Sequence, residues 1–364
     1  MRSLTVFFLS SFRACPGIHR PAAKSLRVLI PALLVLLLAA CGGPAGLETP
    51  SADPSAAVIK IGLLRIDDSV PFYVAEKEGL FAAHGVTVRL VPFNSSADQA
   101  QAMEAGELDM AMNDLIVQAL MRKGGTDTKV VAVAFGATPA EGRFLLVGAP
   151  GSALTAPSPG GADGRIAGVA GKTVAISSNT MMDFLLSQFA ALGFFAPDLS
   201  DVQIVSMPNL MLRVEALIEG RDVQMAILPD PLAAYAVQAG CPVLIDDTAL
   251  GVNLSQSVTL ATETALRERR DEVSRVLAAY FAAMRLINEN PDAYRDFCLE
   301  TANVPAELSA TYPTPSYTPG ALPAEEDLTR VMDWLVERGL LAEAYSYAET
   351  VDTALAAALI AGAD

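Results

Sequence analysis

Apolar and polar residues alternate over residues 58–64 and then run apolar, as in a strand buried in a sheet. A polar bend at 65–68 follows. Ser69 and Pro71 then predict the first turn of a helix, because serine caps free N–H groups and proline has none to leave unpaired. A strand that leads through a polar loop into a helix N-terminus forms a ligand-binding edge, since the free N–H groups there point outward. This unit therefore predicts an α/β sheet with a binding edge.

The same succession of strand and helix patterns continues along the chain. Short apolar or alternating runs predict further strands at residues 86–91, 110–112, 130–135, 144–147, 172–176, 202–206, 225–227, 243–246 and 255–261. Helical patterns lie between them at 97–105, 115–123, 181–192, 210–219 and 232–239. Strands joined by helices favour a mainly parallel sheet with right-handed crossovers.

Polar residues at several predicted helix starts have the pattern of N-caps. Ser96 with Gln99 three residues later fits a capping box. Asn113 and Asp114 directly precede the helix predicted at 115–123. Asp230 followed by Pro231 is typical of an N-cap and a proline at the first helical position. Each of these starts is expected at the carboxyl end of a strand.

Two halves of this pattern keep similar spacing. Ile61 and Met110 are 49 residues apart, and Val174 and Met225 are 51 apart. Each half also carries three polar bends at corresponding positions. We therefore expect two similar lobes whose strand ends face each other across a cleft, which is a favoured place for a small ligand. The boundaries we predict are residues 58–144 and 256–364 for the first lobe, including a helical tail, and 145–255 for the second.

Beyond residue 261 the pattern becomes helical. A long amphipathic helix is predicted within 265–290, and shorter ones at 291–300 and 325–338. We interpret this tail as padding for the first lobe, and Trp334, the only tryptophan, as a core residue rather than a stacking surface for a ligand. A stretch rich in Pro, Gly, Ser and Ala at 148–168 is interpreted as a surface loop without assigned function.

The N-terminus has the pattern of an export signal. Residues 1–40 contain five basic residues and no acidic one, and 28–40 is an apolar run of 13 residues interrupted only by a proline. Such a run is too short to span a bilayer but suits a signal peptide. It ends in Leu-Ala-Ala before Cys41, which resembles a bacterial lipoprotein cleavage box. The alternative is an ordinary signal peptide with a cysteine near its end. Residues 41–57 are predicted to be a flexible tether.

Charge, cysteines and histidines narrow the function classes. Removing residues 1–40 leaves 20 basic against 41 acidic residues, so nucleic-acid binding, which needs a basic face, is not expected. Of four cysteines, Cys241 and Cys298 remain in the mature body, and we interpret them as buried free thiols rather than a disulfide. His19 and His84 are the only histidines. Zinc binding and histidine acid–base catalysis therefore lack residues, and no metal or cofactor is expected.

Several segments in order resemble one family. They are 71–75 with 78–81, then 105–111, 171–176, 216–226, and 333–335 with 339–340. Over about residues 58–350 the sequence resembles the bacterial periplasmic substrate-binding proteins of ABC importers, in the group for nitrate, taurine, aliphatic sulfonates and thiamine-pyrimidine precursors. The resemblance implies a type II periplasmic-binding-protein fold, in which two α/β lobes close over one solute by hinge motion.

The resemblance also implies partners and a location. The closed protein would dock on an ABC permease that works with an ATPase, and it would be a monomer and not an enzyme. A lipid (palmitate) on Cys41 would hold it in the bacterial cell envelope, either in the periplasm or on the outer face of the plasma membrane.

Carried onto this sequence, the resemblance places ligand contacts in six polar bends and the residues beside them. These residues are Arg65, Asp67, Asp68, Ser69, Phe72, Tyr73, Phe93, Asn94, Ser95, Ser96, Asn113, Asp114, Ser177, Ser178, Asn179, Thr180, Met207, Asn209, Pro229 and Asp230. Two features depart from the family: the bend at 93–96 is less glycine-rich, and the stretch at 148–168 is longer.

The charges in these bends bear on the solute. Arg65 is the only basic residue, whereas four aspartates are present, several of which we expect to be helix caps. A small hard anion needs N–H groups and usually a basic side chain, so the balance favours an uncharged or weakly basic organic solute. Aromatic and methionine residues near the bends could contact a planar ring, namely Phe72, Tyr73, Phe93, Met181, Met182 and Met207. A pyrimidine or flavin-like vitamin precursor is therefore our leading hypothesis, and alkanesulfonate, taurine or nitrate the alternative.

Two other function classes remain open. Thiamine-pyrimidine synthases and chorismate-dehydratase-type enzymes share this architecture, but a synthase of that kind needs an active-site histidine and a cysteine-rich motif, which these bends lack. A sensor would dock its closed form on a receptor instead of a permease, and the sequence does not separate that role from transport.

We predict that replacing Cys41 by alanine abolishes incorporation of a labelled fatty acid, because the lipid would attach to this cysteine. Metabolic labelling of cells that express the full chain measures this. Cys241→Ala is the control and should keep the label. Equal labelling of the wild type and Cys41→Ala would contradict the lipoprotein interpretation.

Overall fold

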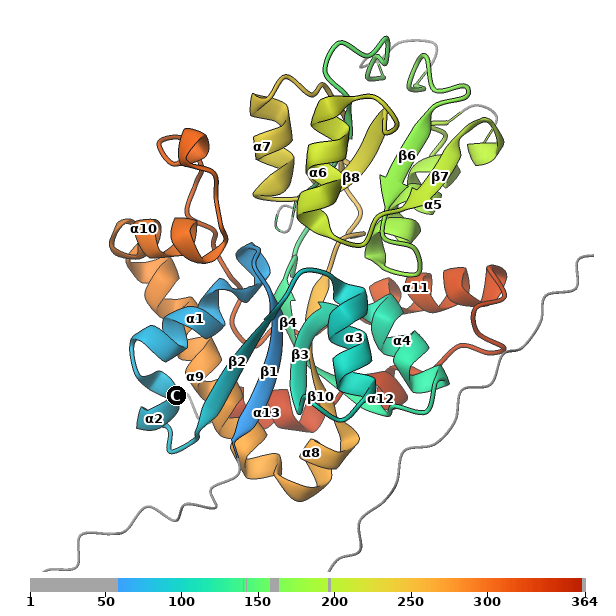
Figure 1. Cartoon of the computed structure of the whole chain (residues 1–364). Coiled ribbons are helices and arrows are strands. Elements are labelled where there is room, and N and C mark those ends of the chain that lie inside the picture. The colour runs from blue at the N-terminus through green and yellow to red at the C-terminus, as the bar shows by residue number, and fades with distance from the viewer. Residues whose placement is uncertain (1–57, 140, 142, 158–163, 196–197, 362–364) are drawn as a thin grey trace, which may run out of the picture. The chain divides into compact units, whose positions relative to one another are not determined.

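The computed structural model describes residues 58–139, 141, 143–157, 164–195 and 198–361. The predicted signal peptide, Cys41 and the tether at 41–57 lie outside the described residues. Within the described part the chain forms two five-stranded sheets with helices packed on them (Figure 1). We call each sheet with its helices a lobe, the first lobe being the one that contains β1.

The first sheet contains three neighbouring parallel strands and a fourth that runs the same way. Its order is β2-β1-β3-β10-β4, with β10 antiparallel to both of its neighbours. The strands are β1 (Ile59–Leu64), β2 (Val88–Phe93), β3 (Met110–Asp114), β4 (Thr128–Phe135) and β10 (Ser257–Thr262).

The second sheet has the same arrangement. Its order is β7-β6-β8-β5-β9, with β5 antiparallel to both neighbours. The strands are β5 (Phe144–Gly148), β6 (Thr173–Ile176), β7 (Gln203–Ser206), β8 (Met225–Pro229) and β9 (Val243–Asp246).

The repeat seen in the sequence spacing is a repeat of strand register. Ile61 pairs with Met110 between β1 and β3, and Val174 pairs with Met225 between β6 and β8. The prediction of mainly parallel sheets is confirmed, with one antiparallel strand in each. The antiparallel strand is β10 in the first sheet and β5 in the second. Each of them enters its sheet directly after the chain has passed from one sheet to the other. No helical crossover constrains such a strand to run parallel.

Helices begin just after the strand ends. In the first lobe they are α1 (Val70–Lys77), α2 (Leu80–Ala83), α3 (Ser96–Glu104) and α4 (Leu115–Lys123). In the second they are α5 (Met181–Ala191), α6 (Leu210–Glu219) and α7 (Leu232–Gln238). Short 3-10 turns lie at Asp67–Ser69, Leu199–Asp201, Asp247–Ala249 and Ala306–Leu308.

Two predicted helix starts need correction, and a third lacks its capping hydrogen bond. The N-cap of α3 is Ser95, whose Oγ accepts from the Asp98 N–H at 3.1 Å, so the capping box predicted at Ser96 is wrong by one residue. Ser69 lies at the N-cap position of α1 but makes no capping hydrogen bond. α7 begins after Pro231, not at it, and Asp230 instead accepts from the Ala234 N–H at 3.2 Å.

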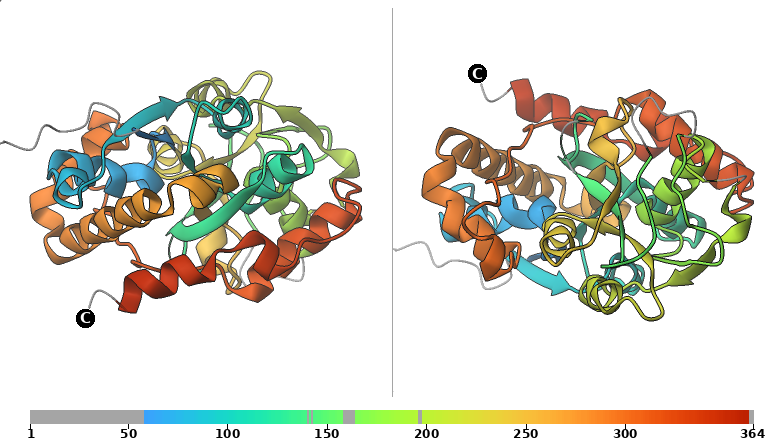
Figure 2. Two further views of the ribbon diagram at one scale, coloured as in Figure 1. Left: turned by 90° about the horizontal axis from the view of Figure 1, so that it is seen from below. Right: turned by 90° about the horizontal axis from the view of Figure 1, so that it is seen from above.

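The tail is made of α8 (Glu263–Glu268), α9 (Arg270–Glu289), α10 (Pro291–Thr301), α11 (Glu325–Glu337), α12 (Tyr347–Thr350) and α13 (Thr353–Ala361). The long amphipathic helix predicted within 265–290 is confirmed as α9, and Arg269 separates it from α8. In Figure 2 the red segment α11–α13 lies along one side of the described chain. None of the described helices is long and apolar enough to cross a membrane.

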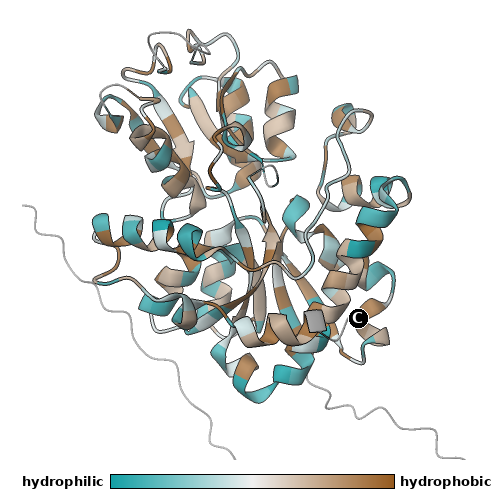
Figure 3. Ribbon diagram, turned by 180° about the vertical axis from the view of Figure 1, so that it is seen from behind, coloured by the Kyte–Doolittle hydropathy of each residue, from teal (hydrophilic) through white to brown (hydrophobic). Residues whose placement is uncertain are grey.

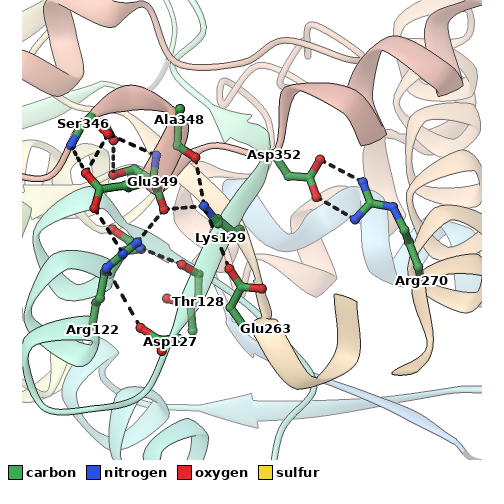
Figure 4. A network of polar contacts seen from close by, with 12 residues as sticks. Arg122, Asp127, Thr128, Lys129, Glu263, Arg270, Ser346, Ala348, Glu349 and Asp352 are labelled. Atoms are coloured by element: carbon green, nitrogen blue, oxygen red, sulfur yellow. Dashed lines mark hydrogen bonds and ion pairs between the residues drawn. The ribbon is translucent and has the colours of Figure 1, made fainter. Parts of the chain in front are cut away.

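Backbone carbonyl groups at the end of α12 tie the tail to the first lobe (Figure 4). Arg122 and Lys129 both donate to the Glu349 carbonyl oxygen, at 2.5 and 2.6 Å. Within the tail, Arg270 of α9 holds Asp352 through two hydrogen bonds of 2.8 and 2.9 Å. Cationic groups at a helix C-terminus are stabilising because the free carbonyl groups there carry partial negative charge. These contacts join α12 to α4 and β4 of the first lobe.

The tail also contacts the second lobe. Trp334 of α11 packs edge-on against Phe184 of α5, with ring centroids 5.6 Å apart, and Arg338 reaches Asp183 at 3.4 Å. Trp334 is 5% exposed, which confirms that it is a core residue. Apolar residues follow the strands of both sheets (Figure 3). The two cysteines of the described chain, Cys241 and Cys298, are free and buried, as expected.

Gly62 in β1 is closely packed against neighbouring side chains. A Cβ at this position would lie 2.7 Å from Leu108 Cδ1 and 2.9 Å from Gln99 Cγ. We predict that Gly62→Ala lowers the free energy of unfolding by about 1–3 kcal/mol, because both neighbours are buried and must move. Denaturant unfolding measures the loss. Gly164→Ala is the control, since nothing lies within 4 Å of its Cβ position. Equal stability of the two variants would contradict the prediction.

Candidate functional site

A cavity lies where strand ends of both sheets meet, and we call it the inner cavity. It has an empty volume of about 480 Å³, part of it open to solvent. Its lining residues are Leu64, Ile66, Asp68, Ser96, Met112, Asn113, Asp114, Phe144, Ser177, Thr180, Met181, Met182, Pro208, Leu210, Pro229 and Ser257. Asp68 and Asp114 are the only charged residues in this lining. The inner cavity is therefore apolar with acidic and neutral polar groups.

Asp114 joins the two lobes through one carboxylate. Its Oδ1 accepts from the Val117 N–H of α4 at 2.8 Å, which is the N-cap bond expected from the sequence. Its Oδ2 accepts from the Met181 N–H of α5, in the other lobe, at 3.0 Å. Burial raises the pKa of Asp114 to about 6, against the lowering effect of these backbone hydrogen bonds. The carboxylate thus occupies free N–H groups at two helix N-termini at once.

Asn113 is held in place by its neighbours. Its Nδ2 donates to Gln99 Oε1 at 2.7 Å and to the Ser96 carbonyl oxygen at 3.3 Å. Its Oδ1 accepts from the Asp114 N–H at 2.9 Å. Because both ends of the amide are engaged, the first-lobe side of the inner cavity is already organised.

The two aspartates after β1 differ in what they face. Asp68 lines the inner cavity, is hydrogen-bonded to Ser257, and has its pKa raised to about 6 by burial. Asp67 instead accepts a short hydrogen bond from the Tyr312 hydroxyl, and its carbonyl oxygen accepts from the Tyr317 hydroxyl at 2.8 Å. Burial raises the pKa of Asp67 to about 7. Of the two, Asp68 is thus the one available to a solute.

The second-lobe side is formed by the loop before α5. Thr180 is the N-cap: its hydroxyl accepts from the Met182 N–H at 3.3 Å and donates to the Ser177 carbonyl oxygen at 2.7 Å. Ser178 and Asn179 of the same loop are exposed and do not line the inner cavity, and Asn179 has a left-handed backbone with φ of 58°. The loop therefore offers Ser177 and Thr180 to the inner cavity.

Arg213 is a buried cation that sequence reasoning missed. It is 0% exposed, and its guanidinium donates to the carbonyl oxygens of Met207, at 2.9 and 2.6 Å, and Ile227, at 3.1 Å. It also contacts the Met182 sulfur. Burial lowers its pKa to about 9. It thus ties together α5, the loop after β7 and strand β8, which contribute to the second-lobe wall. Its position on the apolar stripe of α6, between Leu210 and Leu217, was the signal that could have revealed its burial.

The remaining predicted ligand residues lie away from the inner cavity. Phe72 is fully buried and stacks on Tyr280 at 3.9 Å between ring centroids, so neither its ring nor the buried Ser69 faces the inner cavity. Ser95 caps α3, and the half-buried Met207 holds Arg213 through its carbonyl oxygen.

The other predicted residues lie in hollows beside Arg65 or, in the case of Asp230, in an ion pair. Arg65, Phe93, Asn94 and Asn209 line a separate hollow, and Tyr73 lines another beside Arg65. Asp230 pairs with Arg143 at 2.7 Å. In total the inner cavity brings together Asp68, Ser96, Asn113, Asp114, Ser177, Thr180 and Pro229 from the predicted set, with Met181 and Met182.

Among the described residues there is no group of three or more His, Cys, Asp or Glu side chains arranged to hold a metal ion.

The fold defines a class of protein. The ligand-binding component of an ABC-type import system from Staphylococcus aureus, solved with zinc bound, matches with a TM-score of 0.65 and 17% identity, covering 82% of this chain and 98% of that one. The periplasmic aliphatic sulphonate-binding protein SsuA from Escherichia coli matches with a TM-score of 0.62 and 19% identity, covering 81% and 92%. The desulfurization enzyme DszB matches with a TM-score of 0.61 and 15% identity, covering 84% and 99%. At these identities the likeness shows the fold.

The sequence identifies the family. Residues 52–300 match the NMT1-like family, and the chain belongs to it. The resemblance to the substrate-binding proteins of ABC importers and the two-lobed α/β fold class are both confirmed. No curated protein sequence matches the chain.

The buried carboxyl groups predict how stability depends on pH. Burial raises the pKa of Asp67 and Asp247 to about 7, and of Asp68 and Asp114 to about 6, all above the ordinary value of 3.8. Between these limits the folded chain binds more protons than the unfolded chain, so stability falls as the pH rises through 6 to 7. We expect a higher melting temperature at pH 5 than at pH 8, measured by differential scanning fluorimetry.

Asp67→Asn is the control for this effect. It removes one of the two groups with a pKa near 7, so its melting temperature should change less between pH 6 and 8 than that of the wild type. A wild-type melting temperature that is flat or rises from pH 5 to pH 8 would contradict the prediction.

Proposed function

We propose that this protein is the solute-binding component of an ABC import system, and that it binds its solute in the inner cavity. One observation carries the proposal: the inner cavity is lined from both lobes, and Asp114 hydrogen-bonds helix N-termini of both. A solute in this place contacts both lobes, as a hinge-closing binding protein requires. The S. aureus import component and the E. coli sulphonate-binding protein have the same fold, which supports the proposal.

The solute we propose is a small, uncharged or weakly basic organic molecule, with a pyrimidine or flavin-like vitamin precursor as the leading candidate. The lining contains two carboxyl groups and no cation, so it offers hydrogen-bond acceptors to ring nitrogens and amino groups. Ring contacts would come from Phe144 and from Met112, Met181 and Met182. Phe72, which we had considered for stacking, is engaged with Tyr280.

The alternative is an alkanesulfonate, taurine or nitrate. The sulphonate-binding name of the E. coli relative favours it. The local charge opposes it, because a hard anion would enter beside two aspartates. The N–H of Met181 at the start of α5, where an anion is normally stabilised, already binds the Asp114 carboxylate.

An enzymatic role is the weaker proposal. DszB shows that an enzyme can have this fold. The lining of the inner cavity, however, contains neither histidine nor cysteine. We propose a binding protein that releases its solute unchanged, anchored outside the cytoplasm by lipid on Cys41. It would act as a monomer with a permease and an ATPase, and docking on a sensor receptor would use the same solute-bound form.

A thermal-shift screen tests the proposal. The probes are the aminopyrimidine of thiamine, riboflavin, nitrate, taurine and alkanesulfonates. A solute present at 1,000 times its Kd stabilises the folded protein by about 4 kcal/mol, so a true ligand should shift the melt clearly. We expect a heterocycle to do so and Asp68→Asn to weaken that shift. Asp333→Asn is the control, because Asp333 is exposed and carries the same charge. A melt that only the anions shift would contradict the heterocycle.

A further inference from the structure

A second hollow adjoins the inner cavity, and we call it the outer hollow. It has an empty volume of about 430 Å³, part of it open to solvent. Its lining residues are Arg65, Phe93, Asn94, Asn209, Leu210, Met211, Leu232, Ala302 and Asn303. Leu210 lines both spaces, so the two lie next to each other. Like the inner cavity, the outer hollow is built from both lobes.

Arg65 is the only charged residue in the lining of the outer hollow. It directly follows β1, is exposed, and makes no hydrogen bond or ion pair with any residue of the described chain. The exposed side-chain amides of Asn94 and Asn303 are likewise unbonded within the described residues. The outer hollow therefore presents a guanidinium and two amides whose hydrogen-bonding capacity is free.

Neighbouring cations are engaged elsewhere. Lys77, in the next hollow beyond Arg65, pairs with Glu78 at 2.9 Å and shares that hollow with Glu76 and Glu300. Arg143 pairs with Asp230, and Arg213 is buried against carbonyl oxygens. Among the described residues around the two spaces, Arg65 is thus the cation free to meet a solute.

The two spaces carry opposite charge. The inner cavity has Asp68 and Asp114 and no cation, whereas the outer hollow has Arg65 and no anion. An acidic group in the inner cavity would meet like charge, but in the outer hollow it would meet a planar, always ionised guanidinium that binds oxyanions well. In a chain whose formal net charge is −16, such a local cation also offsets the general repulsion of an acidic solute.

We propose that the outer hollow binds an acidic substituent of the same solute whose neutral or basic end fills the inner cavity. This rests on the proposed function and extends its solute: the uncharged or weakly basic part becomes the head, and a short link joins this nitrogen-bearing head to a carboxylate, phosphate or sulfonate. The whole solute is then amphoteric. Arg65 sets the preference for the acidic substituent, and the inner cavity sets the preference for the head.

Matched pairs of probes test this inference. One pair is the aminopyrimidine alcohol of thiamine and its phosphate monoester, and the other is ethylamine and taurine. Titration calorimetry on the wild type, Arg65→Gln and Arg89→Gln gives each Kd. Arg89 is the control because it is exposed on β2, outside both spaces, and its replacement changes the net charge equally.

We expect the acidic member of a pair to bind the wild type at least about threefold more tightly than its partner, the range of a partly exposed ion pair. Arg65→Gln should remove that preference and leave the Kd of the non-acidic member unchanged, while Arg89→Gln keeps it. The preference should also shrink with added salt, because Arg65 is exposed to solvent.

The outcomes separate the two proposals. Binding of the non-acidic member with no gain from the acidic group, or an acidic-group preference that survives Arg65→Gln, overturns the outer subsite and leaves the inner site standing. Equal weakening of both members by Arg65→Gln also overturns it, because the residue would then act on the fold. Failure of every probe to bind overturns the proposed solute class and this inference together.

Discussion

One carboxylate holds the site together. Asp114 accepts from the Val117 N–H with one oxygen and from the Met181 N–H with the other, so it caps a helix in each lobe. A hydrogen bond to a charged group contributes about 1.5–3 kcal/mol when its partner is otherwise left unpaired. The first lobe fixes the carboxylate firmly, through Asn113 and Gln99, which in turn lies against Gly62. The position of α5 against the first lobe therefore depends on packing that begins in β1.

The second lobe achieves its order in a different way. Its wall of the inner cavity is held together by Arg213, a buried cation bonded to carbonyl oxygens of the loop after β7 and of strand β8. Several carbonyl oxygens together compensate the positive charge of the guanidinium, because each carries a partial negative charge. Burial lowers the pKa of Arg213 to about 9. The site thus has a buried anion on the first-lobe side and a buried cation behind the second-lobe wall. Only the anion lines the inner cavity, which gives the inner cavity its acidic character.

The pattern of the chain predicted the architecture better than the site. The similar spacing of Ile61 and Met110 and of Val174 and Met225 indicated two similar halves, and in the structure each of these pairs is in register between neighbouring strands. It did not predict the antiparallel β5 and β10, whose direction follows from where the chain passes between sheets. The burial of Arg213 and the stacking of Phe72 on Tyr280 arise from tertiary packing. Adjacent serines at 95 and 96 are equivalent in local pattern, and the structure alone distinguishes the cap.

The acidic inner cavity also constrains which solute stabilises the arrangement in which the lobes meet. Burial raises the pKa of Asp68 and Asp114 to about 6, so their ionised forms are incompletely compensated by the protein. A solute that donates hydrogen bonds or carries positive charge supplies the missing compensation, whereas a hard anion adds like charge. Because Asp114 bonds both lobes, a solute that stabilises its ionised form also favours the arrangement in which α4 and α5 share it. Solute recognition and the contact between lobes therefore depend on the same side chain.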